Sequence, residues 1–128
     1  MQGIMNRSHN IGVSGENAVA EYLVKKGYSV LSRNYRIRGG EIDIIASYGE
    51  YIVFVEVKTR KPDSMVSGLD AVNQRKINLI IRTAEDYLFR YPCSLQPRFD
   101  VAEVTAVDGK ITDINYLKDA FGLTGYNF

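Results

Sequence analysis

The sequence predicts an α/β fold in which helices flank a mixed β-sheet, and three observations support this prediction. Apolar residues recur at helical spacing in two long segments, 8–26 and 72–90. Short apolar or alternating runs bounded by glycines lie between and after these segments, as expected for strands. The resulting order of helix, three strands, helix and two strands is typical of an α/β sandwich, and 128 residues fit one domain spanning 1–128.

The first helix is expected over 8–26. Two lysines close it, and Gly27 follows as a residue that can adopt the left-handed conformation at which helices commonly end. Two glycines weaken the first turns of this segment, so the helix could instead begin nearer Ser14.

Three strands are expected next, over 28–35, 41–47 and 51–58. A glycine pair marks the connection between the first two, and a short turn near Gly49 joins the second and third into a hairpin. A polar loop over 62–68 follows the third strand.

A second helix is expected over 72–90, and two further strands, over 99–107 and 111–116, form a hairpin around Asp108-Gly109. The strand that follows the long helix can return parallel to an earlier strand through a right-handed crossover. The apolar stripe of the second helix consists of Ile77, Ile80, Ile81, Ala84 and Leu88.

The net charge of +1 does not by itself indicate a partner. Residues 1–100 carry 14 Lys and Arg against 11 Asp and Glu, whereas residues 101–128 carry 2 against 4. On charge alone a solvated surface of mixed charge is favoured, but if several carboxylates hold a metal, the first hundred residues present a basic surface. The basic clusters are Arg33, Arg36 and Arg38, and Lys58, Arg60 and Lys61.

Cysteine content and hydropathy exclude several classes of protein. Cys93 is the only cysteine, so the chain forms no intramolecular disulfide and no cysteine-based zinc site. No apolar run approaches the length of a membrane span, and the first residues lack the apolar stretch of a secretory signal. We therefore expect a cytoplasmic protein with no membrane association.

The strand expected over 51–58 carries the most informative pattern. Side chains alternate across a strand, so Phe54, Glu56 and Lys58 share one face while three valines share the other. An apolar face that ends in a carboxylate and an ammonium indicates a core that gives way to a cleft.

The preceding strand brings a second carboxylate to this face. If Gly49-Glu50 is a two-residue loop, Asp43 faces Glu56, and directly opposed residues have Cβ atoms about 4.5–5.5 Å apart. A four-residue loop would keep the faces but move the pairing, whereas a three-residue loop would put the two acids on opposite faces. In this strand Glu41, Asp43 and Ile45 share one face, and Ile42, Ile44 and Ala46 take the other.

Two close carboxylates repel each other unless they share a proton or bind a cation. Asp43, Glu56 and the backbone carbonyl of Val57 could hold Mg²⁺ or Mn²⁺, with water and substrate phosphate as the remaining ligands. Lys58 could hold a water on the metal, lower its pKa or stabilise charge at the phosphorus. Glu16, on the first helix, could reach the ion directly or through water.

Simpler explanations exist for each of these features. A surface hairpin could carry a Glu56–Lys58 ion pair and a solvated Asp43, and this explanation is preferable for an E-x-K triplet alone. The triplet at the end of an otherwise apolar strand, with a hairpin turn and a second acid before it, favours a site. Asp100 could support that site, or it could cap a strand or pair with Arg98.

These residues resemble the motifs of the PD-(D/E)XK nuclease superfamily. GEIDII at 40–45, followed by FVEVKTR at 54–60, carries the resemblance, which covers nearly the whole chain. In particular the chain resembles the YraN-like family of small bacterial proteins, which is similar to archaeal Holliday junction resolvases. Other matching positions are G-x-x-G-E-x-x-A-x-x-Y-L at 12–23, Gly27-Tyr28, Asn34, Lys76 and RFDV at 98–101.

The resemblance implies a restriction-endonuclease-like sandwich and Mg²⁺-dependent hydrolysis of phosphodiester bonds. By position Asp43 and Glu56 match the metal-binding acids, Lys58 matches the catalytic lysine, and Glu16 matches the acid that the resolvase-like branch carries on its first helix. Ile42 stands where the superfamily name has proline, a replacement that the fold tolerates.

The sequence therefore favours a metal-dependent DNA endonuclease, with branched or recombination DNA among its candidate substrates. A non-catalytic nucleic-acid-binding module and an RNA nuclease are the alternatives, because the sequence does not reveal recognition of the 2′-hydroxyl. A resolvase would need two active sites and hence a homodimer. The candidate contacts to nucleic acid are Arg36, Arg38, Arg60, Gln74 and Lys76, although the last two could also belong to a solvated first helical turn.

Overall fold

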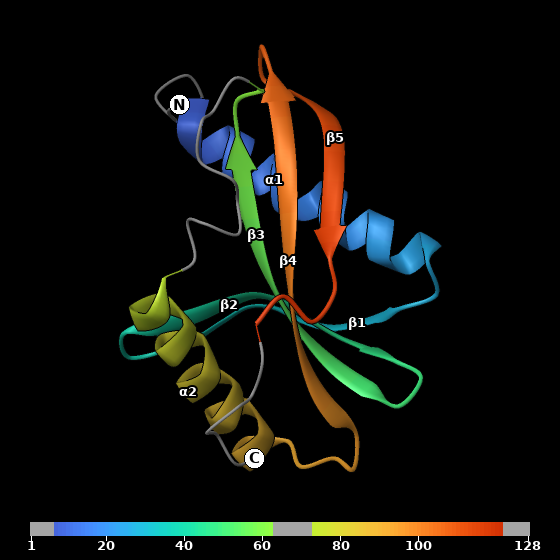
Figure 1. Ribbon diagram of the computed structural model, residues 1–128, viewed down its shortest axis with the longest axis vertical. Helices are drawn as coiled ribbons and strands as arrows, with labels where there is room; N and C mark the ends of the chain where they lie inside the picture. Colours follow the sequence, from blue (N-terminus) through green and yellow to red (C-terminus); the bar gives the residue numbers. More distant parts are fainter. Residues whose placement is uncertain (1–6, 63–72, 122–128) are drawn as a thin grey trace, which may run out of the picture.

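The computed structural model describes residues 7–62 and 73–121, which form a five-stranded sheet with a helix on each face (Figure 1). The strands lie in the order β1-β2-β3-β4-β5, with β3 and β4 parallel and all other neighbours antiparallel. The predicted mixed sheet flanked by helices is confirmed. The elements are α1 (Arg7–Lys25), β1 (Ser29–Ile37), β2 (Gly40–Tyr48), β3 (Tyr51–Arg60), α2 (Gln74–Arg90), β4 (Gln96–Val107) and β5 (Lys110–Leu117).

Helix α1 begins at Arg7, so the longer of the two predicted helices is correct and the start near Ser14 is wrong. The helix ends just before Gly27, as the sequence predicts. Gly27 has a φ of 95°, and the N–H of Tyr28 donates to the carbonyl of Leu23 at 2.9 Å. This hydrogen bond runs from the residue after the glycine back to the last turn of the helix. It satisfies a carbonyl group that would otherwise have no partner at the helix end.

Helix α2 is capped by Asn73, whose side chain accepts a hydrogen bond from the backbone N–H of Lys76 at 2.9 Å. The predicted apolar stripe faces the sheet, and Thr83 and Tyr87, which the sequence analysis did not include, are buried with it. Apart from Pro62, the polar loop predicted over 62–68 lies outside the described residues.

Both predicted hairpins are confirmed. Tyr48 pairs with Tyr51 across a two-residue turn, which fixes the register that the acid pair requires. In the second hairpin Asp108 and Gly109 have φ values of 51° and 79°. Left-handed conformations at both positions match the twist of antiparallel strands, which explains the Asp-Gly sequence there.

The core is divided by the sheet into two clusters. On the α2 side Phe54 stacks on Phe99, with ring centroids 5.4 Å apart, and helix residues such as Ile81 pack against them. On the α1 side Val19 and Leu23 pack against alternate residues of β2, β3 and β4. Strand β3 contributes to both clusters, as the alternation of its sequence predicts.

The predicted alternation fails at one point in β2. Ile42, expected on the same face as Ile44, packs in the cluster on the opposite side of the sheet, beside α2. In the neighbouring strand, Asn34 has a φ of 54°. The flanking pairs of β1 and β2 place Asn34 opposite Asp43, so the backbone is irregular at the acid itself.

Strands β2 and β3 part at the same point. Their paired residues run from Tyr48 and Tyr51 to Ile44 and Val55, and beyond that pair each strand keeps only its other neighbour. Figure 1 shows the start of β2 lying beside the end of β1 near α2, while the second half of β3 runs with β4 in another direction. Across the described residues, no helix is both long and apolar enough to cross a membrane.

Candidate active site

Two buried carboxyl groups lie where β2 and β3 part. Asp43 and Glu56 are each only 8% exposed, and Asp43 Oδ2 accepts a hydrogen bond from the backbone N–H of Val57 at 2.8 Å. Burial, a hydrogen bond with Glu56 and the charge of Glu56 together raise the pKa of Asp43 to about 8, although the Val57 N–H acts in the opposite direction. The two acids thus meet as the predicted register requires.

Two lysines complete the cluster. Lys58 follows Glu56 on β3, and Lys76 reaches the site from the first turn of α2, with Nζ 3.1 Å from Glu56 Oε2. Burial lowers the pKa of Lys58, and contact with Lys76 lowers it further. Burial acts against the charge of Lys76 as well, but its contacts with Lys58 and Glu56 outweigh burial and raise its pKa.

The contact between Lys76 and Glu56 is an ion pair without the alignment of a hydrogen bond. Glu56 Oε2 is a buried oxygen that has no hydrogen-bond partner among the described residues, even though the ammonium lies near it. Buried carboxylate oxygens in this condition are rare, because leaving one unsatisfied is costly. A cation that approached Glu56 Oε2 would therefore meet the Lys76 ammonium there.

Glu16 approaches the same cluster from α1. Its Oε1 lies 3.9 Å from Arg33, and its side chain has a hydrogen bond with Asn34. Burial raises the pKa of Glu16 against the opposing charge of Arg33, and Glu41 and Glu56 raise it further. Asn34, whose backbone is in the left-handed conformation, thus connects Glu16 to the irregular part of β1. The position of Asn34 in the sequence does not by itself reveal this role.

The donor set suits a hard divalent cation with few protein ligands. Within 13–62 and 73–121, whose side chains are described, no three Asp, Glu, His or Cys residues form a group that could hold a metal by side chains alone. Mg²⁺ often takes only one or two carboxylates and fills its other positions with water and phosphate. The carbonyl of Val57 projects from the same strand edge as its N–H, which points at Asp43.

A cavity of about 340 Å³ adjoins the acids on the α2 side. Glu56 and Lys76 lie on its wall together with Arg75, Asn73, Gly39 of the β1–β2 turn and Glu41 at the start of β2. Positive side chains and the first turn of a helix therefore border the acid pair on this side.

The other residues predicted to contact nucleic acid are dispersed. Arg36 forms an ion pair with Glu41, Arg38 is exposed in the β1–β2 turn, and Gln74 donates to Asn78 of its own helix at 2.8 Å. Arg60 lies 3.6 Å from Glu103 on the neighbouring strand. Of the five, only Lys76 contacts the acid pair, and the sequence had placed it at the helix start without linking it to Glu56.

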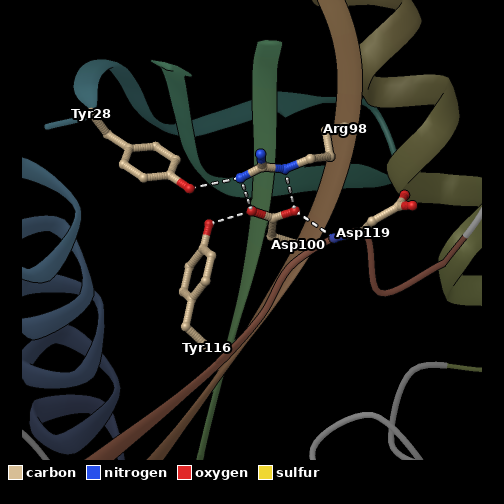
Figure 2. Close-up of polar contacts among 5 residues, drawn as sticks. All are labelled: Tyr28, Arg98, Asp100, Tyr116 and Asp119. Carbon is tan, nitrogen blue, oxygen red and sulfur yellow. Dashed lines mark hydrogen bonds and ion pairs between the residues drawn. The ribbon is translucent and has the colours of Figure 1, made fainter. Parts of the chain in front are cut away.

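Arg98 and Asp100 form a separate cluster in which Asp100 is fully buried (Figure 2). Asp100 accepts two hydrogen bonds from Arg98 at 3.0 and 2.8 Å, one from Tyr116 at 2.6 Å and one from the N–H of Asp119 at 2.9 Å. Arg98 also donates to the hydroxyl of Tyr28 at 2.7 Å. The ion pair considered for these residues is present, and it fastens β5 and the chain after it to the sheet.

Comparison with known proteins identifies the family to which the chain belongs. Residues 15–104, which include the acids and lysines of the site, match the family model described as Uncharacterised protein family UPF0102. A UPF0102 protein of Alkaliphilus metalliredigens is 44% identical over 115 residues, which cover 89% of this chain and 99% of the relative. Another, of Caldicellulosiruptor bescii, is 47% identical over 118 residues and covers 87% and 96%. The chain belongs to the UPF0102 family, which confirms the resemblance to YraN-like proteins.

Proposed function

We propose that this member of the UPF0102 family is a metal-dependent endonuclease of the PD-(D/E)XK superfamily that hydrolyses phosphodiester bonds of DNA. The observation that carries the proposal is the buried pair Asp43 and Glu56, at the point where β2 and β3 part, with Lys58 and Lys76 against it. A buried acid pair destabilises the fold unless it serves to bind a cation or a proton.

Different residues of the chain would have different roles in such a reaction. Asp43 and Glu56 would hold Mg²⁺ or Mn²⁺, and the Val57 N–H keeps the Asp43 carboxylate oriented. A divalent ion bound there would lower the pKa of a coordinated water and offset charge on the phosphate. Lys58 would orient the attacking water or stabilise charge at the phosphorus, and Glu16, whose charge interacts with that of Glu56, would assist in this.

DNA, including branched or recombination intermediates, is the proposed substrate because the positive residues around the cavity suit a phosphate backbone. A homodimer would supply the two active sites that a four-way junction requires. The alternatives are a binding module that lacks turnover and a nuclease acting on RNA. The two lysines against the acids favour an enzyme over a binding module, since a module needs basic residues only on its surface.

Cleavage of defined substrates tests the proposal. Linear, flapped and four-way DNA and matching RNA are incubated with the protein and Mg²⁺ or Mn²⁺ in single-turnover reactions. We expect metal-dependent cleavage that Lys58→Ala slows by about 10²-fold or more, the scale of losing one preorganised charged group. Lys58→Ala should still bind metal and DNA.

Glu56→Ala, purified in the same way, controls for contaminating nucleases and must be inactive. Nucleic-acid binding that weakens with salt, without cleavage of any substrate, would favour the binding module instead. Cleavage by Lys58→Ala at the rate of the parent would refute the assigned role of Lys58.

A further inference from the structure

The position of Lys76 implies a role that the acid–acid–lysine motif does not include. Its Nζ lies 3.1 Å from Glu56 Oε2, so the ammonium is the nearest positive charge to an oxygen proposed to bind the metal. An ammonium and a divalent cation cannot both approach one carboxylate oxygen closely, because their charges repel. A metal ion that binds Glu56 must therefore displace Lys76 or share the carboxylate with it.

The structure leaves room for this displacement. Lys76 is anchored through its backbone, which donates to the Asn73 cap, and its side chain is 38% exposed. The cavity of about 340 Å³ lies beside the ammonium, and Arg75 and the first turn of α2 border the same space. An anion in that cavity would meet the cationic side chains of Arg75 and Lys76 and the positive end of a helix, against the opposing charges of Glu41 and Glu56 on the same wall.

We propose that Lys76 exchanges the Glu56 carboxylate for a phosphate of the substrate as the metal binds. In the metal-free protein Lys76 offsets the charge of the acid pair and competes with the cation. With substrate present, the phosphate in the cavity takes Lys76 away from Glu56, so the acid is free for the metal. Metal and nucleic acid then promote each other's binding, as thermodynamic linkage requires of two ligands that favour the same state.

The proposal rests on the proposed function, and it predicts an unusual direction of change. Replacing Lys76 by methionine keeps the length and the apolar part of the side chain but removes the competing charge. Lys76→Met should bind Mn²⁺ more tightly than the parent in the absence of nucleic acid, while it binds DNA more weakly and cleaves it more slowly. A merely structural lysine would give unchanged or weaker metal binding on replacement.

Isothermal titration with Mn²⁺ measures this effect, with a non-cleavable oligonucleotide present or absent. We expect the Mn²⁺ Kd of Lys76→Met without DNA to fall by about fivefold or more, within the usual range of coupling between sites. Added oligonucleotide should tighten Mn²⁺ binding more in the parent than in the variant. Lys76→Arg, which restores the positive charge, should return the Kd toward that of the parent.

Arg75→Met is the matched control, because it removes an equal charge from the adjacent residue on the same cavity wall. It should weaken DNA binding and leave the Mn²⁺ Kd unchanged. This result would distinguish direct competition between Lys76 and the metal at Glu56 from a general change in the electrostatic field of the site. If Lys76→Met binds Mn²⁺ no more tightly than the parent, or if Arg75→Met tightens binding equally, the exchange is refuted while the nuclease proposal stands. A parent protein that binds no Mn²⁺ would overturn both.

Discussion

The acid pair should make the metal-free protein less stable as the pH rises, which is opposite to the usual behaviour of carboxylates. In the folded chain Asp43 has a pKa of about 8, whereas an unfolded aspartate titrates near 3.9. Below about pH 3.9 both states are protonated and the contribution to stability is complete. Between the two pKa values the folded state holds a proton that the unfolded state has released, so stability is lost progressively up to pH 8.

The size of this loss of stability follows from a difference of one bound proton between the folded and unfolded states. A difference of one bound proton changes the free energy of unfolding by about 1.4 kcal/mol per pH unit. Between pH 5 and pH 7 the metal-free protein should therefore lose up to about 2.7 kcal/mol from this site. For a domain of this size that loss corresponds to a fall in melting temperature of roughly 10 °C.

Urea and thermal unfolding at pH 5, 6, 7 and 8 with a chelator measure the slope. Asp43→Asn should flatten it and should be more stable than the parent at pH 8, because the amide needs no proton and still offers an oxygen to the Val57 N–H. Mg²⁺ should flatten the slope of the parent too, since a cation replaces the proton. Glu50→Gln, an exposed acid in the neighbouring turn, should keep the parental slope.

The reasoning fails if the metal-free parent is equally stable at pH 5 and pH 8. It also fails if Asp43→Asn retains the slope, because the proton would then reside on another group. A slope that persists at saturating Mg²⁺ would show that the cation does not bind at this pair.

Two further substitutions test the packing that positions the site. Asp100→Asn should lower the free energy of unfolding by about 3 kcal/mol or more, because the buried Arg98 loses its counter-charge. Urea unfolding measures this loss. A loss below about 1 kcal/mol would mean that the ion pair is solvated. Gly40→Ala would place a Cβ 2.2 Å from Thr83 Oγ1 and 3.4 Å from the carbonyl of Leu79, so we expect a cost of about 1–3 kcal/mol. Gly40→Ala combined with Thr83→Ala should be less destabilised than the two single losses added together, and strict additivity in thermal melts would exclude the contact.

The register of the acid pair was predictable because it depends on local features. Glycine turns define where each hairpin reverses, and alternation along β2 and β3 then assigns faces without any knowledge of the rest of the molecule. The sequence left the length of the turn open, and the two-residue turn of the structure gives the Tyr48–Tyr51 pair and the proximity of Asp43 to Glu56. Two carboxylates on adjacent strands were therefore visible in the sequence.

The residues that were missed depend on contacts that no local pattern encodes. Lys76 meets Glu56 because of the path of the chain between β3 and α2, which alternation and helical periodicity do not determine. Ile42 lies on the α2 side of the sheet, and in the neighbouring strand Asn34 adopts a left-handed conformation. A single asparagine within a strand gives only a weak indication of this, since asparagine tolerates that conformation better than most residues.

The two buried aspartates of the sheet show why one cluster is a candidate site and the other is structural. Asp100 is completely buried, yet four hydrogen bonds, two of them from the Arg98 guanidinium, satisfy its carboxylate, so the fold depends on its charge and leaves no capacity for a ligand. Asp43 is almost as buried, but its chief neighbour is another acid, and that acid has an oxygen without a hydrogen bond. The same change from Asp to Asn should therefore destabilise the protein at position 100 and stabilise it at position 43 at pH 8. Opposite signs for one chemical substitution at two buried sites would show that the fold depends on the charge of Asp100 and not on that of Asp43.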